Sequence, residues 1–151
     1  MWYKARTFRV GDFPMAGYSG TPLPKKLCIK EGARVALVNA PPGFESLLGA
    51  LPEGAGFVPA SRKGLDVVLL FARSRAELVR RFESLAGRIK PDGSLWVAWP
   101  KRASGVETDL AEPYVRQHGL DVGLVDVKVC AVDETWSGLR FVYRLKDRPR
   151  R

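Results

Sequence analysis

Arg34-Val-Ala-Leu-Val-Asn-Ala-Pro-Pro-Gly-Phe-Glu45 is the part of this chain from which the fold can be inferred most directly. Its first half, Arg34 to Val38, is short and apolar, as is typical of a parallel strand covered on both faces. Its second half turns at Pro41 and Pro42 and continues into residues that predict a short helix from Gly43 to Leu51. This stretch therefore predicts the strand, turn and helix of an α/β protein.

Strand and helix patterns alternate through most of the remaining sequence. We expect helices over residues 22–29, 75–89 and 109–117, strands over 56–59, 65–71 and 94–99, and a final β-hairpin formed by 124–132 and 139–145. Such alternation predicts a three-layer, Rossmann-like α/β fold with a mostly parallel sheet, to which the hairpin adds C-terminal antiparallel strands.

Local signals predict where several of these helices begin and end. Ser74-Arg-Ala-Glu77 has the form of a capping box, in which the glutamate reaches back to the serine amide. Pro91-Asp-Gly93 is expected to stop that helix, and His118-Gly119 to end the next one, with His118 as a cap. In the short helix expected from Gly43 to Leu51, we expect an inward apolar face formed by Phe44, Leu47, Leu48 and Leu51.

Length and composition indicate one globular domain. The chain has 151 residues, of which 46% are hydrophobic and 27% are charged. We expect an extension at 1–14, a single domain at 15–146 and a basic tail at 147–151. No apolar run approaches a membrane span of about 20 residues, and the N-terminus lacks a secretory signal, so we expect a cytoplasmic protein. Cys28 and Cys130 are far apart and predict reduced, buried thiols.

The chain is strongly basic, with a formal net charge of +9. Such an excess favours an anionic partner, and nucleic acid bound by the basic termini is one alternative function. Aromatic and basic residues interleave in Trp2-Tyr-Lys-Ala-Arg-Thr-Phe-Arg9, a pattern suited to stacking on single strands. The opposing interpretation is that this terminal charge is simply solvated.

Two motifs resemble known families. Gly87-Arg-Ile-Lys-Pro-Asp-Gly-Ser-Leu-Trp-Val97 resembles the helix end, turn and strand of class I S-adenosylmethionine-dependent methyltransferases, and the C-terminal hairpin is similar to the reversed last strand of that fold. The resemblance implies a methyltransferase-like fold and S-adenosylmethionine as a cofactor. Two departures argue against retained methyl transfer: prolines replace the glycines of the first loop, and Phe57-Val-Pro-Ala-Ser61 lacks the acid that holds ribose hydroxyls.

A closer resemblance is to an uncharacterised bacterial set, the domain-of-unknown-function family 3052. The motifs that carry it are Met15-Ala-Gly-Tyr-Ser-Gly20, Ala36-Leu-Val-Asn-Ala-Pro-Pro-Gly-Phe44, Leu95-Trp-Val-Ala-Trp-Pro-Lys101 with Ser104-Gly105, Thr108-Asp109, and Val132-Asp-Glu-Thr-Trp-Ser-Gly-Leu-Arg-Phe141. Membership implies the methyltransferase-like fold and brings no established activity.

Ligands of open α/β sheets bind beyond the carboxyl ends of the strands, beside the point where the strand order reverses. Applied to the predicted strands, this rule selects residues 39–43, 72–74, 99–105 and 133–137, and within them seven candidate ligand-binding residues: Asn39, Gly43, Trp99, Lys101, Ser104, Gly105 and Trp136. An ammonium and a helix-start amide favour a small anionic or nucleotide-like ligand. The alternative is that Trp99 belongs to the core and Ser104-Gly-Val-Glu107 is only a capping box.

Four residues are candidates for catalysis: Lys101, Asp109, Asp133 and Glu134. The three acids could hold Ca²⁺ or Mg²⁺ and activate water in a small hydrolase of esters or lactones, or one acid could act as a general base. The opposing interpretation is that acids in a hairpin loop are solvated. His118 is the single histidine, and no Gly-x-Ser-x-Gly motif accompanies it. Whether the protein is an enzyme, and its oligomeric state, stay open at this point.

Overall fold

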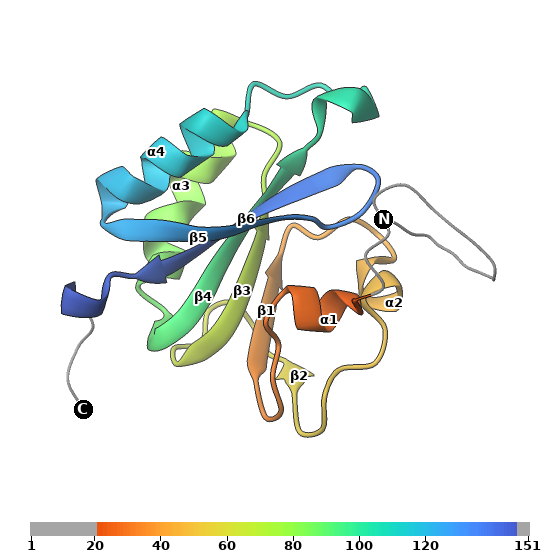
Figure 1. The fold of residues 1–151 in the computed structure, drawn as a ribbon, viewed down its shortest axis with the longest axis vertical. Helices are drawn as coiled ribbons and strands as arrows, with labels where there is room; N and C mark the ends of the chain where they lie inside the picture. Colours follow the sequence, from red (N-terminus) through yellow and green to blue (C-terminus); the bar gives the residue numbers. More distant parts are fainter. Residues whose placement is uncertain (1–20, 148–151) are drawn as a thin grey trace.

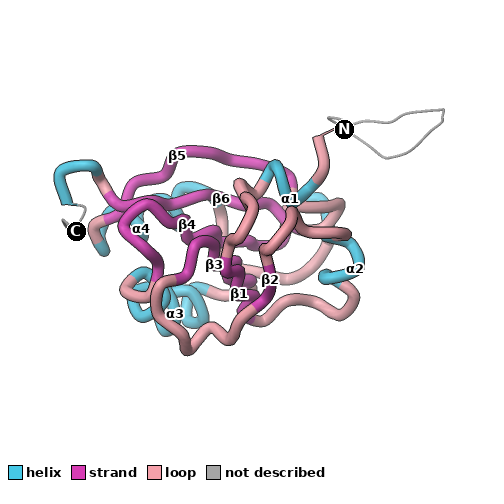
Figure 2. Tube along the Cα trace, turned by 90° about the horizontal axis from the view of Figure 1, so that it is seen from below, coloured by secondary structure: helices cyan, strands magenta, loops and turns pink. Residues whose placement is uncertain are grey.

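The computed structural model describes residues 21–147, which form one six-stranded sheet with helices on both faces (Figure 1 and Figure 2). The expected extension at 1–14, the motif at 15–20 and the basic residues from 148 onward lie outside this described range. Within it, no helix is both long enough and apolar enough to cross a membrane.

The elements alternate as the sequence predicts. The strands are β1 (Arg34–Val38), β2 (Gly56–Phe57), β3 (Leu65–Phe71), β4 (Ile89–Pro100), β5 (Leu124–Ala131) and β6 (Trp136–Tyr143). The α-helices are α1 (Leu23–Lys26), α2 (Phe44–Leu48), α3 (Arg75–Ala86) and α4 (Glu112–Val122), and two 3₁₀ turns cover Arg102–Ser104 and Leu145–Asp147.

The strand order is β2-β1-β3-β4-β6-β5. The first four strands of this order pair in parallel, whereas β6 pairs antiparallel with both β4 and β5. The Rossmann-like fold class with its antiparallel hairpin is therefore confirmed. The chain moves outward from β1 to β2 and then returns to place β3 on the other side of β1, so the strand order reverses between β1 and β3.

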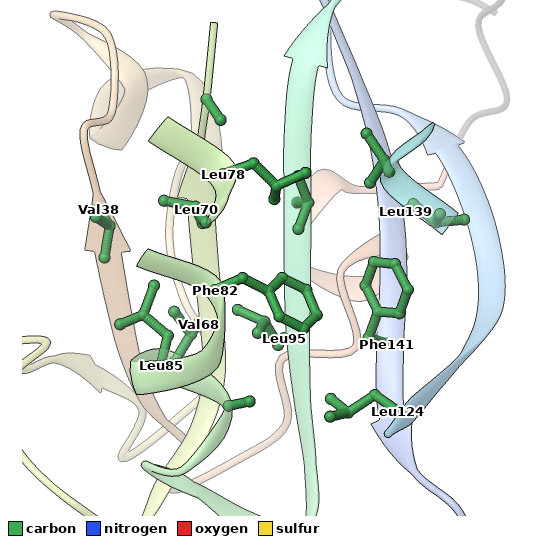
Figure 3. Close-up of a cluster of buried hydrophobic side chains, with 14 of the residues drawn as sticks. Val38, Val68, Leu70, Leu78, Phe82, Leu85, Leu95, Leu124, Leu139 and Phe141 are labelled. Carbon is green, nitrogen blue, oxygen red and sulfur yellow. The ribbon is translucent and has the colours of Figure 1, made fainter. Parts of the chain in front are cut away.

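Alternate side chains of the central strands pack into separate cores on the two faces of the sheet. On one face, Val68 and Leu70 of β3 meet Leu78 and Phe82 of α3 (Figure 3). On the other face, Leu69 and its neighbours meet residues from α1 and α2. A run of apolar residues therefore forms a strand here because both of its faces are covered.

The first strand ends as predicted, but α2 is shorter than expected. Gly49, with a φ of +80°, ends the helix after Leu48. Phe44 and Leu48 are buried, whereas Leu47 is 52% exposed, so the prediction that Leu47 points inward is wrong. Five residues provide little more than one helical turn, which buries only one pair of side chains.

Helix α3 begins at the predicted cap. Ser74 Oγ accepts a hydrogen bond from the Glu77 amide at 3.1 Å. The Glu77 carboxylate accepts a hydrogen bond from the Arg73 amide at 2.7 Å. The sequence predicts the amide of Ser74 as its partner, which is one residue later. This capping box therefore fixes the backbone directly after β3.

Pro91-Asp-Gly93 does not stop α3, which ends at Gly87 before β4 begins at Ile89. The predicted turn is an irregularity inside β4, where the pairing register with β3 shifts. A Cβ at Gly93 would lie 2.9 Å from the Leu65 carbonyl oxygen, so only glycine fits this close backbone approach.

Helix α4 begins three residues later than expected, because Pro113 can occupy only the first turn. Gly119 lies inside the helix, and Gly123, with a φ of +114°, ends it. His118 is therefore not a cap. Its ring packs edge-on against Phe82, with 5.2 Å between ring centroids.

The hairpin loop is also tighter than expected. Asp133 Oδ1 accepts the amides of Thr135 and Trp136, both at 2.8 Å, so β6 begins at Trp136 rather than Leu139. At the outer edge, the Lys26 ammonium donates to the Ala131 carbonyl at 3.1 Å. This contact joins α1 to the edge strand β5.

Candidate functional site

Four loops meet at the carboxyl edge of the sheet. Residues 39–43, 72–74 and 101–105 follow the parallel strands β1, β3 and β4. Residues 133–135 join this edge because Trp136, which begins the antiparallel β6, pairs with Pro100 at the end of β4. We call this region the carboxyl-edge site, and it lies beside the reversal of strand order between β1 and β3.

The first loop turns through two residues in the left-handed conformation. Asn39 has a φ of +59° and Gly43 a φ of +81°. Asparagine and glycine tolerate such angles, and the Pro41 carbonyl accepts the Phe44 amide at 3.2 Å to close the turn. A Cβ at Gly43 would meet no atom within 4 Å, so Gly43 faces open space. Asn39 is exposed beside it.

Arg73 lies at the centre of this edge, within the 72–74 segment that the strand-end rule selects, but it is not among the seven candidate ligand-binding residues. Its side chain is exposed, and its guanidinium carbon lies 5.5 Å from the ring centroid of Trp136. The signal that could have identified it was the capping box, because that motif places Arg73 directly between the end of β3 and the start of α3.

The loop after β4 is held by its own backbone and by the hairpin. The Lys101 amide donates to the Thr135 carbonyl at 2.7 Å, and Ser104 Oγ donates to the Lys101 carbonyl at 2.6 Å. Ser104 Oγ also accepts the Val106 amide at 3.2 Å, while Gly105 adopts a φ of +77°. Ser104 therefore shapes the loop, whose charged groups are the partly buried Lys101 and the exposed Arg102.

A second set of contacts ties the segment before α4 to the start of α3. Thr108 Oγ1 donates to the Arg73 carbonyl at 2.6 Å. Asp109 Oδ1 accepts the Arg75 amide at 2.8 Å, and the Asp109 carbonyl accepts Arg75 Nε at 3.0 Å. The Asp109 carboxylate thus satisfies a free amide in the first turn of a helix.

The two tryptophans differ from the expectation of ligand contact. Trp99 is 5% exposed and belongs to the core beneath α3 and α4. Trp136 is 4% exposed, and its ring packs edge-on against Phe71, with 5.0 Å between centroids. We therefore leave Trp99 out of the proposed binding set. The role that we assign to Trp136 is to support the Arg73 side chain.

The three candidate metal ligands do not gather into a cation site. Asp109 and Asp133 each accept backbone amides in different loops, and Glu134 is exposed. Across residues 21–147, no group of three His, Cys, Asp or Glu side chains is arranged to hold a metal ion. The expectation of Ca²⁺ or Mg²⁺ bound by these acids is therefore unsupported, because Asp109 and Asp133 are engaged with backbone amides and the three acids form no cluster.

Cys130 is not activated as a nucleophile. Cys28 and Cys130 are free and half-buried rather than fully buried. Burial raises the pKa of the Cys130 thiol, although the ammonium groups of Lys26 and Lys128 oppose this effect. A raised pKa lowers the thiolate fraction, and the thiolate is the nucleophilic form.

No family model matches the chain, and no curated protein matches it, so the resemblance to family 3052 is not confirmed. Solved structures do match. The DhpI–SAH complex aligns with a TM-score of 0.55 and 10% identity, covering 82% of this chain and 83% of that one. The fold is methyltransferase-like.

Two further methyltransferases support this statement. A TehB-like S-adenosylmethionine-dependent methyltransferase from Corynebacterium glutamicum aligns with a TM-score of 0.51 and 10% identity, covering 76% of this chain and 82% of that one. Magnesium protoporphyrin IX methyltransferase from Synechocystis, solved with bound SAH, aligns with a TM-score of 0.52 and 14% identity, covering 81% and 78%. At such identities the likeness shows the fold alone.

The residues at the carboxyl-edge site do not fit the complete methyl donor. Pro41 and Pro42 have no amide to donate, and residues 58–61 after β2 contain no carboxylate for a ribose. The charges of the exposed Arg73 and the partly buried Lys101 are positive, as is the sulfonium of the donor. They fit an anion instead, so we derive no methyl transfer from this site.

A separate hollow of about 510 Å³ lies elsewhere. Its lining includes Pro22, Ile29, Lys30 and Leu51, from α1, the turn before β1 and the segment after α2. Because Lys30 precedes β1, this hollow lies toward the amino end of that strand and is not part of the carboxyl-edge site.

Proposed function

We propose that this methyltransferase-like domain binds a small anionic or nucleotide-like ligand at the carboxyl-edge site. The observation that carries the proposal is the convergence of four loops beside the reversal of strand order. Asn39 and Gly43 would border the ligand from one side and Lys101 with Gly105 from the other. Methyl transfer is not part of this proposal, and neither is metal-assisted hydrolysis.

Each proposed contact has a chemical role. The Asn39 side chain offers both a donor and an acceptor to a base or sugar. Gly43 leaves room for a ligand because open space faces its α-carbon. The Lys101 ammonium forms no ion pair with any side chain of residues 21–147, so it is available to a phosphate or carboxylate.

Isothermal titration calorimetry of the full chain tests the proposal. The ligands are S-adenosylmethionine, S-adenosylhomocysteine, AMP and ATP. We expect at least one of them to bind, and Lys101→Ala to weaken that binding by about tenfold, because a hydrogen bond to a charged group contributes about 1.5–3 kcal/mol.

Lys63→Ala is the matched control. Lys63 is exposed and precedes β3, at the opposite edge of the sheet, so its loss changes the net charge equally without touching the site. Absence of binding by every ligand, or equal weakening by the two substitutions, contradicts the proposal.

A further inference from the structure

We propose that Arg73 binds the anionic group of the ligand, a phosphate or a carboxylate, and that Thr108 positions Arg73 for this task. The inference rests on the proposed function, since it names the recognition group of the same site. The strand-end rule selects the segment that contains Arg73, but neither Arg73 nor Thr108 was itself chosen as a binding residue, and the case for both comes from their contacts.

The Arg73 guanidinium has unused donors. No carboxylate of residues 21–147 forms an ion pair with it, and its side chain is exposed at the centre of the carboxyl edge. The guanidinium carbon lies over the Trp136 ring, 5.5 Å from its centroid, and the guanidinium N–H groups donate to no residue in 21–147. Two parallel N–H groups match the geometry of a phosphate or carboxylate.

The backbone of Arg73 is held on both sides. Its amide donates to the Glu77 carboxylate at 2.7 Å, and its carbonyl accepts Thr108 Oγ1 at 2.6 Å. A buried indole, 4% exposed, supports the side chain from beneath. A charged group fixed in this way loses less conformational freedom on binding than a free arginine does.

The neighbouring Arg75 has a different task. Its Nε donates to the Asp109 carbonyl at 3.0 Å, and its guanidinium carbon lies 4.2 Å from the ring centroid of Tyr114. These contacts join α3 to the segment before α4. Of these two arginines, Arg73 is therefore the one whose guanidinium N–H groups form no hydrogen bond with residues 21–147.

The local charge selects an anion. The Arg73 guanidinium lies over the Trp136 ring, and the backbone of Lys101 is hydrogen-bonded to that of Thr135, so both residues adjoin the same hairpin loop. The exposed carboxylate of Glu134 belongs to that loop and opposes them. Arg102, which follows Lys101, is a third cation and is exposed, so basic groups outnumber the exposed acid around a compact anionic group here.

Three ligands that share an adenosine moiety separate the sources of the anion. Adenosine carries no anionic group, AMP carries a phosphate, and S-adenosylhomocysteine carries a carboxylate. We expect the full chain to bind AMP or S-adenosylhomocysteine at least about tenfold more tightly than adenosine in calorimetry, which identifies phosphate or carboxylate as the preferred group.

Substitutions at Arg73 test the assignment. Arg73→Gln should remove this tenfold preference while leaving adenosine binding unchanged, and Arg73→Lys should restore it only in part, because an ammonium lacks the paired N–H groups. Arg80→Gln is the matched control, since Arg80 is exposed on α3 and makes no ion pair with a described residue. Glu134→Gln should tighten binding of the anionic ligand by removing the opposing charge.

Substitutions at Thr108 test positioning. Thr108→Val removes the hydroxyl and should both weaken anion binding several-fold and shift the Arg73 Nε–Hε resonance in nitrogen-15 NMR spectra. Thr108→Ser keeps the hydroxyl and should restore both quantities. A role confined to folding would lower stability without moving the Arg73 resonance or its response to AMP.

The outcomes distinguish this inference from the proposed function. If no adenosine-containing ligand binds, both fail. If a ligand binds, but Arg73→Gln and Arg80→Gln weaken it equally, the function stands and the inference is overturned. If Arg73→Gln abolishes the preference but Thr108→Val leaves both measurements unchanged, the assignment of Thr108 is wrong.

Discussion

At Gly119, helix propensity and side-chain packing lead to opposite expectations. Alanine favours a helix interior over glycine by about 1 kcal/mol. However, a Cβ at Gly119 would lie 2.0 Å from Cε1 of Phe141, whose buried ring also packs on Phe82. We expect packing to dominate, so that Gly119→Ala lowers the free energy of unfolding by about 1–3 kcal/mol in urea titrations.

Gly87→Ala provides the comparison for this prediction. Gly87 follows α3 with a right-handed φ of −71°, and a Cβ there would meet its nearest atom at 3.6 Å. We expect that variant to match or exceed the wild type in stability. Equal behaviour of the two alanine variants would show that the Phe141 ring moves aside at no cost.

Tyr143 makes the stability depend on alkaline pH. Its hydroxyl donates to the Ala86 carbonyl at 2.6 Å, and burial raises the pKa of the phenol above its ordinary value of 10.0. The folded protein therefore holds this proton more tightly than the unfolded chain. The resulting stability is complete below pH 10 and is lost as the pH rises through the folded pKa.

The variant Tyr143→Phe isolates this effect. Near pH 7 it should be less stable than the wild type by about 0.5–1.5 kcal/mol, because one hydrogen bond is lost. The difference should narrow as urea titrations are repeated above pH 10, since only the wild type loses the phenol contribution. A constant difference up to pH 11 would contradict the linkage.

Among the secondary-structure elements, α3 depends most visibly on a single cap. Ser74 Oγ accepts the Glu77 amide, which otherwise has no partner within the helix. Ser74→Ala should lower the free energy of unfolding by about 1 kcal/mol. Ser84→Ala, at an exposed position in the same helix, should be neutral or slightly stabilising, so a similar loss in both variants would rule out capping as the cause.

Local patterns predicted the elements whose signals are contained in a few neighbouring residues. The limits of β1 and β3 agree with their apolar runs, and Ser74 caps α3. The errors arose where distant contacts determine the boundary. Gly93 resembles a turn residue but lies in β4 against the Leu65 carbonyl, and Gly119 resembles a helix end but lies inside α4 against Phe141.

The candidate site was predictable in its place but not in its chemistry. Parallel strand signals followed by turns place Asn39 and Lys101 at one edge, and the strand order agrees. Trp99 is buried because α3 and α4 cover its face of β4. No short motif in the sequence indicates which face of the strand these helices cover. The free charge of Arg73 depends on the absence of a partner, and a motif cannot show this either.

The two cores make the whole molecule cooperative. Leu69 and Leu70 are adjacent in β3 but pack on opposite faces, and Trp96 and Trp99 of β4 divide in the same way. Leu69→Ala and Leu70→Ala should each lower the free energy of unfolding by about 2–5 kcal/mol. Because both cores share one sheet, either substitution should affect both faces equally.

Fluorine NMR of 5-fluorotryptophan-labelled protein checks this expectation. The Trp96 and Trp99 signals report on opposite faces of the sheet, and their unfolding midpoints in urea should shift together in each variant. Separate midpoints for the two signals would mean that one layer unfolds while the other persists.

The last strand of the sheet does not lie at its edge. Strand β6 lies between β4 and β5, so the apolar edge of β4 from Leu95 to Trp99 has no hydrogen-bonding neighbour until residues 137–141 are available. During synthesis on the ribosome, these residues emerge after all the other strands. The nascent chain must therefore keep a half-paired sheet in solution until β6 has emerged, and chaperones that shield exposed strands would act in that interval.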